Sequence, residues 1–241
     1  MLSSLLSIHE HSFIINEPGF DRGFYRLTEQ YAGLSDIHID RLQQYQGHPE
    51  QMIKAFRTFV APRMGKHFRH LGVKECILGD WQWYPNFFPD MRYVVLARDP
   101  RDVMLSVLEY GERIAWHRKM WADRPDSYIA ERHNAIWAHQ KEMLASKNCL
   151  GVTYEDLCTN ETTLRRILRH CKFDTDRVGR ADAAVTRLFA WRDWEGKRHG
   201  NSVSAKSVSR WQRETDEHKL SRAHAVAGRM TEYCHYWGYK I

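Results

Sequence analysis

The chain has 241 residues, of which 43% are hydrophobic and 12% aromatic, so it can bury one sizeable core without requiring a second domain. A formal net charge of +6 favours an anionic partner, but nucleic acid, a nucleotide and an acidic membrane surface all meet that condition. No apolar stretch is long enough to span a bilayer, and the histidines lack zinc-site spacing, so we expect neither a transmembrane segment nor a metal site.

The cysteines indicate the redox environment. The sequence contains five of them, an odd number with no CxxC pair, so they cannot all be bridged. A reducing compartment is the simplest interpretation, and we therefore expect a cytoplasmic protein.

Helices and one short strand are predicted in the first ninety residues. Apolar residues recur at helical spacing over 1–8 with no capping residue before them, so we expect the chain to begin inside a helix. A further helix is predicted over 51–71, followed by a short strand over 73–77 and a helix that ends within 85–90.

The clearest local signal lies at 91–106. The apolar, β-branched run 91–97 is typical of a strand buried in a parallel sheet, and a polar turn follows it at once. Asp99 suits the N-cap of a helix, Pro100 its first position, and Asp102 the third position of a capping box. Strand, tight turn and helix together make half of a βαβ unit.

The remainder continues the alternation of strands and helices. A largely helical region is predicted over 102–147 with a break near Pro125, followed by a strand over 149–153 and a helix over 161–171. A serine-rich loop then spans 200–209, and the last predicted element is an amphipathic helix over 218–236. We therefore predict an α/β fold with a central parallel sheet flanked by helices.

Arg98 is the first candidate for chemistry. Ligands of open α/β sheets bind at the carboxyl ends of the strands, where helix N-termini present free N–H groups to anions. The Arg98 guanidinium can clamp a phosphate there, and Ser106, two helical turns further on, can add a hydroxyl donor. Alternatively, Arg98 pairs with Asp99 or Asp102 at the surface. The residues alone leave both interpretations open.

The segment 93–106 resembles the 3′-phosphate-binding motif of sulfotransferases that use 3′-phosphoadenosine 5′-phosphosulfate (PAPS), where an arginine after a strand precedes a serine by eight positions. Other segments resemble the same family, in its bacterial and tyrosylprotein-type branch, and occur in family order: 71–75, 88–90, 152–157, 207–211 and 237–239. The resemblance implies a P-loop-NTPase-like three-layer sandwich over 1–241, as one domain.

The start of the sequence departs from the family pattern. Family members begin with a strand and a glycine-containing loop whose N–H groups cradle the 5′-phosphosulfate, and these residues contain no such loop. Residues 1–9 resemble the helix that follows the loop. The resemblance therefore implies that the first strand and the loop lie upstream of Met1.

The resemblance also assigns catalytic roles. Glu17 matches a glutamate that takes the proton of the attacking acceptor hydroxyl, and Lys74 a lysine that stabilises charge on the bridging oxygen of the leaving phosphate. Ser209 matches a late serine that helps to hold the sulfuryl group. Each has a plain structural alternative: Glu17 caps or pairs locally, Lys74 snorkels from a strand edge, and Ser209 belongs to a flexible connector.

The donor site is implied in the same way. Arg98 and Ser106 are expected to bind the 3′-phosphate, Tyr154 to lie near the adenine, and Lys206 to reach a donor phosphate. Tyr154 could equally be a strand residue that fills the core.

The function implied is transfer of a sulfuryl group from PAPS to a hydroxyl or amine acceptor, without a metal or a nucleic acid partner. An alternative is an inactive nucleotide-binding relative that lacks the phosphosulfate loop but keeps Arg98 and Ser106. A P-loop kinase relative is a third possibility, although the Walker lysine motif is absent. The sequence does not distinguish carbohydrate, lipid, phenol and peptide acceptors.

Overall fold

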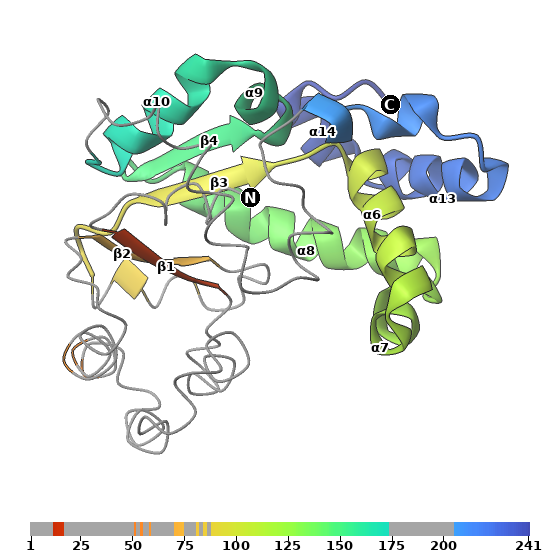
Figure 1. Ribbon diagram of the computed structural model, residues 1–241, viewed down its shortest axis with the longest axis horizontal. Helices are drawn as coiled ribbons and strands as arrows, with labels where there is room; N and C mark the ends of the chain where they lie inside the picture. The colour runs from red at the N-terminus through yellow and green to blue at the C-terminus, as the bar shows by residue number, and fades with distance from the viewer. Residues whose placement is uncertain are drawn as a thin grey trace. The chain divides into compact units, whose positions relative to one another are not determined.

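The computed structural model describes residues 12–16, 70–74, 88–173 and 205–241, together with residues 51, 54, 58, 81, 84 and 85 (Figure 1). The chain divides into two units, one of residues 1–89 and 172–203 and the other of residues 90–171 and 204–241. The predicted helix over 1–8 and the candidate base Glu17 lie outside the described residues. The single domain over 1–241 stays a prediction.

A two-stranded parallel sheet is described in the first unit. Strand β1 (Ser12–Asn16) pairs with β2 (His70–Lys74), with Ser12 opposite His70 and Asn16 opposite Lys74. The helix predicted over 51–71 is therefore wrong at its end, and the strand predicted to start at residue 73 starts at His70. A helical spacing of apolar residues carries no information about hydrogen bonds to a strand far away in the sequence. Here the pairing of β2 with β1 determines the conformation of residues 70–74.

The second unit contains a parallel pair that the sequence predicts well. Strand β3 (Tyr93–Ala97) pairs with β4 (Cys149–Thr153), and every second side chain of β3 is buried. The strands predicted over 91–97 and 149–153 are confirmed, the second of them to the residue. Both strands can be predicted because a short run of apolar and β-branched residues is the main sequence signal of a buried strand.

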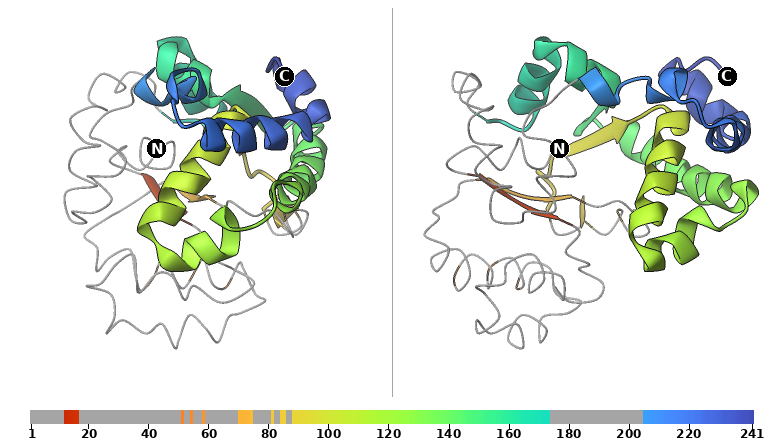
Figure 2. Two further views of the ribbon diagram at one scale, coloured as in Figure 1. Left: turned by 90° about the vertical axis from the view of Figure 1, so that its right-hand side faces the viewer. Right: turned by 45° about the vertical axis from the view of Figure 1, so that its right-hand side comes forward.

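Helices cover this small sheet on both sides. Helix α8 (Asp126–Leu144) contacts β3 and β4, whereas α9 (Tyr154–Thr159) and α10 (Glu161–His170) contact β4. Figures 1 and 2 show α8 on one side of the strands and α9 with α10 on the other. The arrangement is consistent with the predicted α/β class. None of the helices in the described part of the chain has the length and apolar content that a membrane crossing requires.

The predicted helical region 102–147 consists of several helices. Helix α6 (Pro100–Arg113) ends before Ile114, whose backbone is extended, and two short elements follow, α7 (Ala115–His117) and the π-helical η5 (Arg118–Ala122). The predicted break at Pro125 is confirmed, because this residue is the N-cap of α8. The break at Ile114 was not predicted.

The predicted final helix over 218–236 is in fact two helices, α13 (Glu217–Gly228) and α14 (Thr231–Trp237). Helix α13 ends at Gly228, and Met230, which is buried in the core with 3% of its surface exposed, is the N-cap of α14. Gly238, with a φ of 77°, ends α14, and the Tyr239 N–H donates to the Cys234 carbonyl at 2.8 Å. This Schellman turn brings Tyr239 back toward the sheet.

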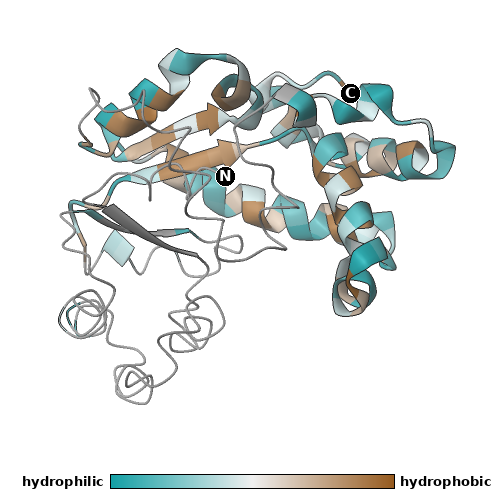
Figure 3. Ribbon diagram, viewed as in Figure 1, coloured by the Kyte–Doolittle hydropathy of each residue, from teal (hydrophilic) through white to brown (hydrophobic). Residues whose placement is uncertain are grey.

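The core of the second unit joins β3 to helices α6, α8, α13 and α14. Figure 3 shows its apolar character most clearly along β3 and β4. A single cluster of buried residues contains Ala97, Met104, Leu105, Leu108, Ala122, Ile129, Ala130, Trp137, Ala223, Val226, Met230, Tyr233 and Cys234. The C-terminal helices therefore pack on the same core as the strand that precedes α6.

Replacing Gly151 with alanine tests this packing. A Cβ atom at position 151 of β4 would lie 2.8 Å from both Leu144 Cδ2 and Trp237 Cη2. We expect Gly151→Ala to lower the free energy of unfolding by about 1–3 kcal/mol, as overpacked cores do. Urea denaturation measures the change.

Gly228→Ala is the matched control, because a Cβ atom there meets nothing within 4 Å at the end of α13. We expect its stability to be unchanged or about 0.5 kcal/mol higher. Equal losses for both variants would contradict the packing described around Gly151.

Candidate functional site

The turn between β3 and α6 forms the centre of the candidate site. Strand β3 ends at Ala97, Arg98 and Asp99 make the turn, and α6 begins at Pro100. The Asp99 carboxylate accepts a hydrogen bond from the Arg101 N–H at 2.9 Å. The predicted N-cap at Asp99 and first helical position at Pro100 are thus confirmed, and Arg98 stands at the carboxyl end of a parallel strand.

The predicted capping box is wrong. The Asp99 N–H, which Asp102 would accept in such a box, donates instead to Glu155 Oε1 at 3.1 Å. The fully buried Asp102 accepts the backbone N–H of Trp211 at 3.0 Å. Burial raises the pKa of the Asp102 carboxyl, and the hydrogen bond from Trp211 opposes that shift. Tertiary partners have thus replaced the local reciprocal bond.

Asp99 is not the partner of Arg98. Its carboxylate forms a bidentate pair with the buried Arg101, with Nε to Oδ1 at 2.9 Å and Nη2 to Oδ2 at 2.7 Å. The Arg101 guanidinium also lies 3.7 Å from the centre of the Trp211 ring. Arg101 is therefore the residue that satisfies the turn's aspartate, and the proposed surface pair between Arg98 and Asp99 is wrong.

Three residues predicted for the donor site lie together. Arg98 Nη1 donates to Ser106 Oγ at 3.3 Å, and the guanidinium lies 4.5 Å from the centre of the Tyr154 ring. Arg98 Nη2 donates to the Ser207 carbonyl at 2.9 Å. Tyr154 is the first residue of α9, so it is not a strand residue. The turn after β3, helix α6 and the start of α9 each supply one of the three side chains.

The Arg98 guanidinium keeps capacity for a further acceptor. Its Nε is buried and has no hydrogen-bond partner among the described residues. Within that same part of the chain Arg98 forms no ion pair, and its two bonded acceptors, Ser106 Oγ and the Ser207 carbonyl, are neutral. A cation with a buried, unfilled donor favours an anion. Burial raises the pKa of the Tyr154 phenol, with the neighbouring Cys158 acting in the same direction.

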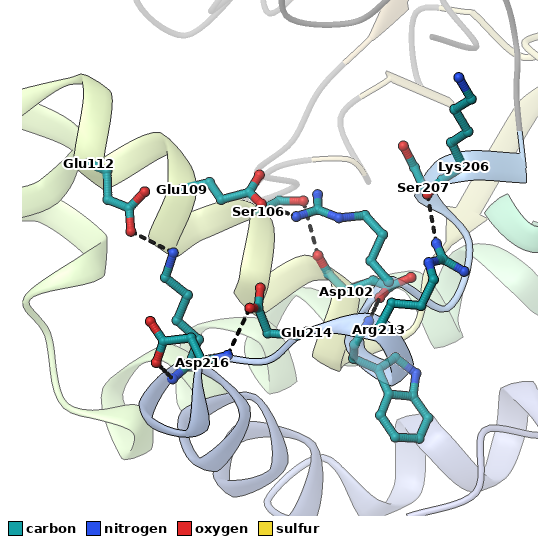
Figure 4. A network of polar contacts seen from close by, with 12 residues as sticks. Asp102, Ser106, Glu109, Glu112, Lys206, Ser207, Arg213, Glu214 and Asp216 are labelled. Carbon is teal, nitrogen blue, oxygen red and sulfur yellow. Dashed lines mark hydrogen bonds and ion pairs between the residues drawn. The ribbon is translucent and has the colours of Figure 1, made fainter.

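A short segment beside Arg98 carries the other predicted donor residues. It contains the 3₁₀ turns η7 (Ala205–Ser207) and η8 (Arg210–Arg213). Lys206 is exposed, and in Figure 4 its side chain extends away from Asp102. Among the hydrogen bonds of the described residues, Ser207 reaches Arg98 and Ser209 does not. The contact with Arg98 is made by the main-chain carbonyl of Ser207, and the role predicted for Ser209 stays a prediction.

Ion pairs join this segment and the start of α13 to α6. Arg210 pairs with Glu109, and Lys219 pairs with Glu112 at 2.6 Å (Figure 4). Arg213 Nη2 donates to the carbonyls of Lys206 and Val208, at 2.8 and 3.1 Å, and so closes the segment on itself. The two ion pairs therefore tie the segment and the start of α13 to the C-terminal half of α6.

The predicted catalytic residues are not assembled by these contacts. Lys74 is the last residue of β2, in the first unit, and Glu17 lies outside the described residues. Their roles stay predictions, as does that of Ser209.

Two site residues were missed by sequence reasoning. The Tyr233 hydroxyl accepts the Arg98 N–H at 2.9 Å and donates to the Arg98 carbonyl at 3.0 Å. Glu155 accepts the Asp99 N–H, as described above. Glu155 directly follows Tyr154 at the carboxyl end of β4, which is a usable signal. No sequence pattern links Tyr233 to a residue 135 positions earlier.

The backbone of Ser209 provides a test of the segment. Ser209 has a φ of 50°, in the left-handed region that serine rarely adopts. We expect Ser209→Gly to raise the free energy of unfolding by about 0.5–1 kcal/mol, because relief of the strain exceeds the added chain entropy of glycine. Ser221→Gly, at an exposed position of α13, should lower it by about 0.5 kcal/mol. A destabilised Ser209→Gly variant would show that the serine side chain holds the turn.

Residues 83–177 match the model of the sulfotransferase family. No curated protein matches the chain. The matched segment runs from before β3 to beyond α10 and therefore includes Arg98, Ser106 and Tyr154. The match supports a sulfotransferase family member, and the site at the end of β3 lies within the part of the chain that carries it.

Proposed function

We propose that this chain binds PAPS and transfers its sulfuryl group to a hydroxyl or amine acceptor. The family match supports a transferase that moves sulfuryl groups in general. The observation that carries the choice of donor is the junction of β3 and α6, where Arg98 contacts Ser106 and lies over the Tyr154 ring. A guanidinium, a hydroxyl and an aromatic ring are the groups needed for a phosphate attached to an adenosine.

The 3′-phosphate is the group that this constellation suits. The buried Nε of Arg98 offers a donor without a partner among the described residues, and the charge of the guanidinium favours a dianion over a neutral ligand. The Ser106 hydroxyl lies beside the guanidinium and donates to the main-chain carbonyl of Asp102 at 3.0 Å. The adenine is expected at Tyr154.

The transfer itself needs little from the protein because the donor is already activated. The acceptor oxygen or nitrogen forms a bond to sulfur while the bond from sulfur to the bridging phosphate oxygen breaks. The electron pair of that bond stays on the phosphate, which leaves as adenosine 3′,5′-bisphosphate. Glu17 is proposed to take the acceptor proton, Lys74 to stabilise the leaving oxygen, and Ser209 with Lys206 to hold the donor.

The first test is removal of the Arg98 side chain. We expect Arg98→Ala to weaken the binding of adenosine 3′,5′-bisphosphate by about 1–3 kcal/mol, the cost of losing a charged hydrogen-bond partner. Isothermal titration calorimetry measures the affinity without an acceptor.

Arg166→Ala is the control, since Arg166 is an exposed arginine of α10 with the same charge. Its affinity for the nucleotide should equal that of the wild type. An unchanged affinity of Arg98→Ala would remove Arg98 from the site, and a wild type that does not bind the nucleotide would refute the proposed donor.

The second test separates binding from chemistry. If Lys74 stabilises the leaving oxygen, Lys74→Met should lower the rate of sulfuryl transfer by about 10²-fold or more and change nucleotide affinity far less. Release of adenosine 3′,5′-bisphosphate from PAPS, measured with a mixture of carbohydrate, phenol, lipid and peptide acceptors, reports the rate before the acceptor is known. Lys54→Met, an exposed lysine of the same unit, is the control. Binding of the nucleotide without any transfer would favour an inactive relative.

A further inference from the structure

The main chain of Arg98 finds no hydrogen-bond partner in the described β3–β4 ladder. The β3–β4 ladder ends with the pair Ala97 and Thr153, so the N–H and C=O of Arg98 lie beyond it. Buried backbone groups without a partner are costly. Both groups are satisfied by one side chain, because the Tyr233 hydroxyl accepts from Arg98 N at 2.9 Å and donates to Arg98 O at 3.0 Å.

The next peptide of the turn is held in the same manner. The Asp99 N–H donates to Glu155 Oε1 at 3.1 Å, and Glu155 Oε2 accepts the Tyr239 hydroxyl at 2.8 Å. The rings of Tyr233 and Tyr239 are stacked, with centroids 6.1 Å apart and planes 21° apart. Two tyrosines of the C-terminal region and one glutamate of α9 therefore fix the main chain from which the Arg98 side chain projects.

Tyr233 is itself rigidly placed. It is 7% exposed, belongs to the buried core, and packs edge-on against Trp137 with the planes at 90°. Burial raises the pKa of the Tyr233 and Tyr239 phenols, so both hydroxyls keep the proton that they donate. A hydroxyl that donates and accepts at one residue restrains both the position and the direction of that peptide.

We infer that Tyr233 is a positioning residue of the donor site, which acts through the Arg98 main chain and never touches the nucleotide. The inference rests on the proposed function, because it assumes that Arg98 binds the donor phosphate. It adds that the affinity for the nucleotide depends on the hydroxyl of Tyr233 in α14, the last helix. Without this hydroxyl the guanidinium keeps its charge but loses the fixed origin that aims it between Ser106 and Tyr154.

Tyr233→Phe removes only the hydroxyl and leaves the ring to pack. We expect it to weaken the binding of adenosine 3′,5′-bisphosphate about tenfold. Tyr236→Phe is the matched control, because Tyr236 lies in the same helix, is 55% exposed, and forms no hydrogen bond among the described residues. Its affinity should not change.

A double-mutant cycle distinguishes positioning from general loosening of the fold. Arg98→Ala keeps its backbone N–H and C=O, so the bonds to Tyr233 persist, but it has no guanidinium to aim. In that background Tyr233→Phe should cause no further loss of nucleotide affinity. An equal loss in both backgrounds would overturn the inference, since Tyr233 would then act on the fold and not through Arg98.

Each remaining outcome is also decisive. If the wild type binds the nucleotide, Arg98→Ala binds it weakly and Tyr233→Phe binds like the wild type, the inference is wrong and the proposed function stands. If the wild type does not bind the nucleotide, both are wrong.

Circular dichroism checks folding, and if Tyr233→Phe does not fold, Glu155→Gln replaces it. Glu155→Gln removes the charge that holds the Asp99 N–H and should give a loss of the same kind, again absent in the Arg98→Ala background.

Discussion

The candidate site depends on one constraint: a turn that leaves a parallel sheet must find partners for its main chain while it presents a cation. The described β3–β4 ladder ends at Ala97, and α6 begins at Pro100. Side chains from two distant helices provide the missing hydrogen bonds, and in doing so they fix the base of the Arg98 side chain. The same turn thus combines a fixed backbone with an arginine whose buried Nε has no hydrogen-bond partner among the described residues.

Charge is divided within the same turn. Arg101 takes the Asp99 carboxylate in a bidentate pair and stacks on Trp211, so the neighbouring acid does not neutralise Arg98. One oxygen of the Asp102 carboxylate accepts the Trp211 N–H. The acceptors bonded to the Arg98 guanidinium, the Ser106 hydroxyl and the Ser207 carbonyl, are both neutral. This division explains how a segment rich in both charges can hold one arginine available to an anion.

Much of the second unit could be predicted from sequence because its signals are local. The runs that form β3 and β4, the N-cap Asp99 and the break at Pro125 each depend on a few adjacent residues. The failures have a common physical cause, which is a partner far away in the chain. Strand β2 forms because it pairs with β1, and Met230, between α13 and α14, is buried in the core. Asp102 accepts the N–H of Trp211 in place of the local N–H of Asp99. The contact of Ser106 with Arg98 was predictable from a motif, whereas that of Tyr233 was not.

The separation of 135 residues between Arg98 and Tyr233 has a consequence for the order of folding. Strand β3 and helix α6 are neighbours in the chain and can form early, but closing so long a loop is slow and costs entropy before it gains any contact. The turn that carries Arg98 therefore acquires its final shape only when α14 docks. A folding intermediate that already contains the strand and the helix would still lack the ordered turn of the candidate site.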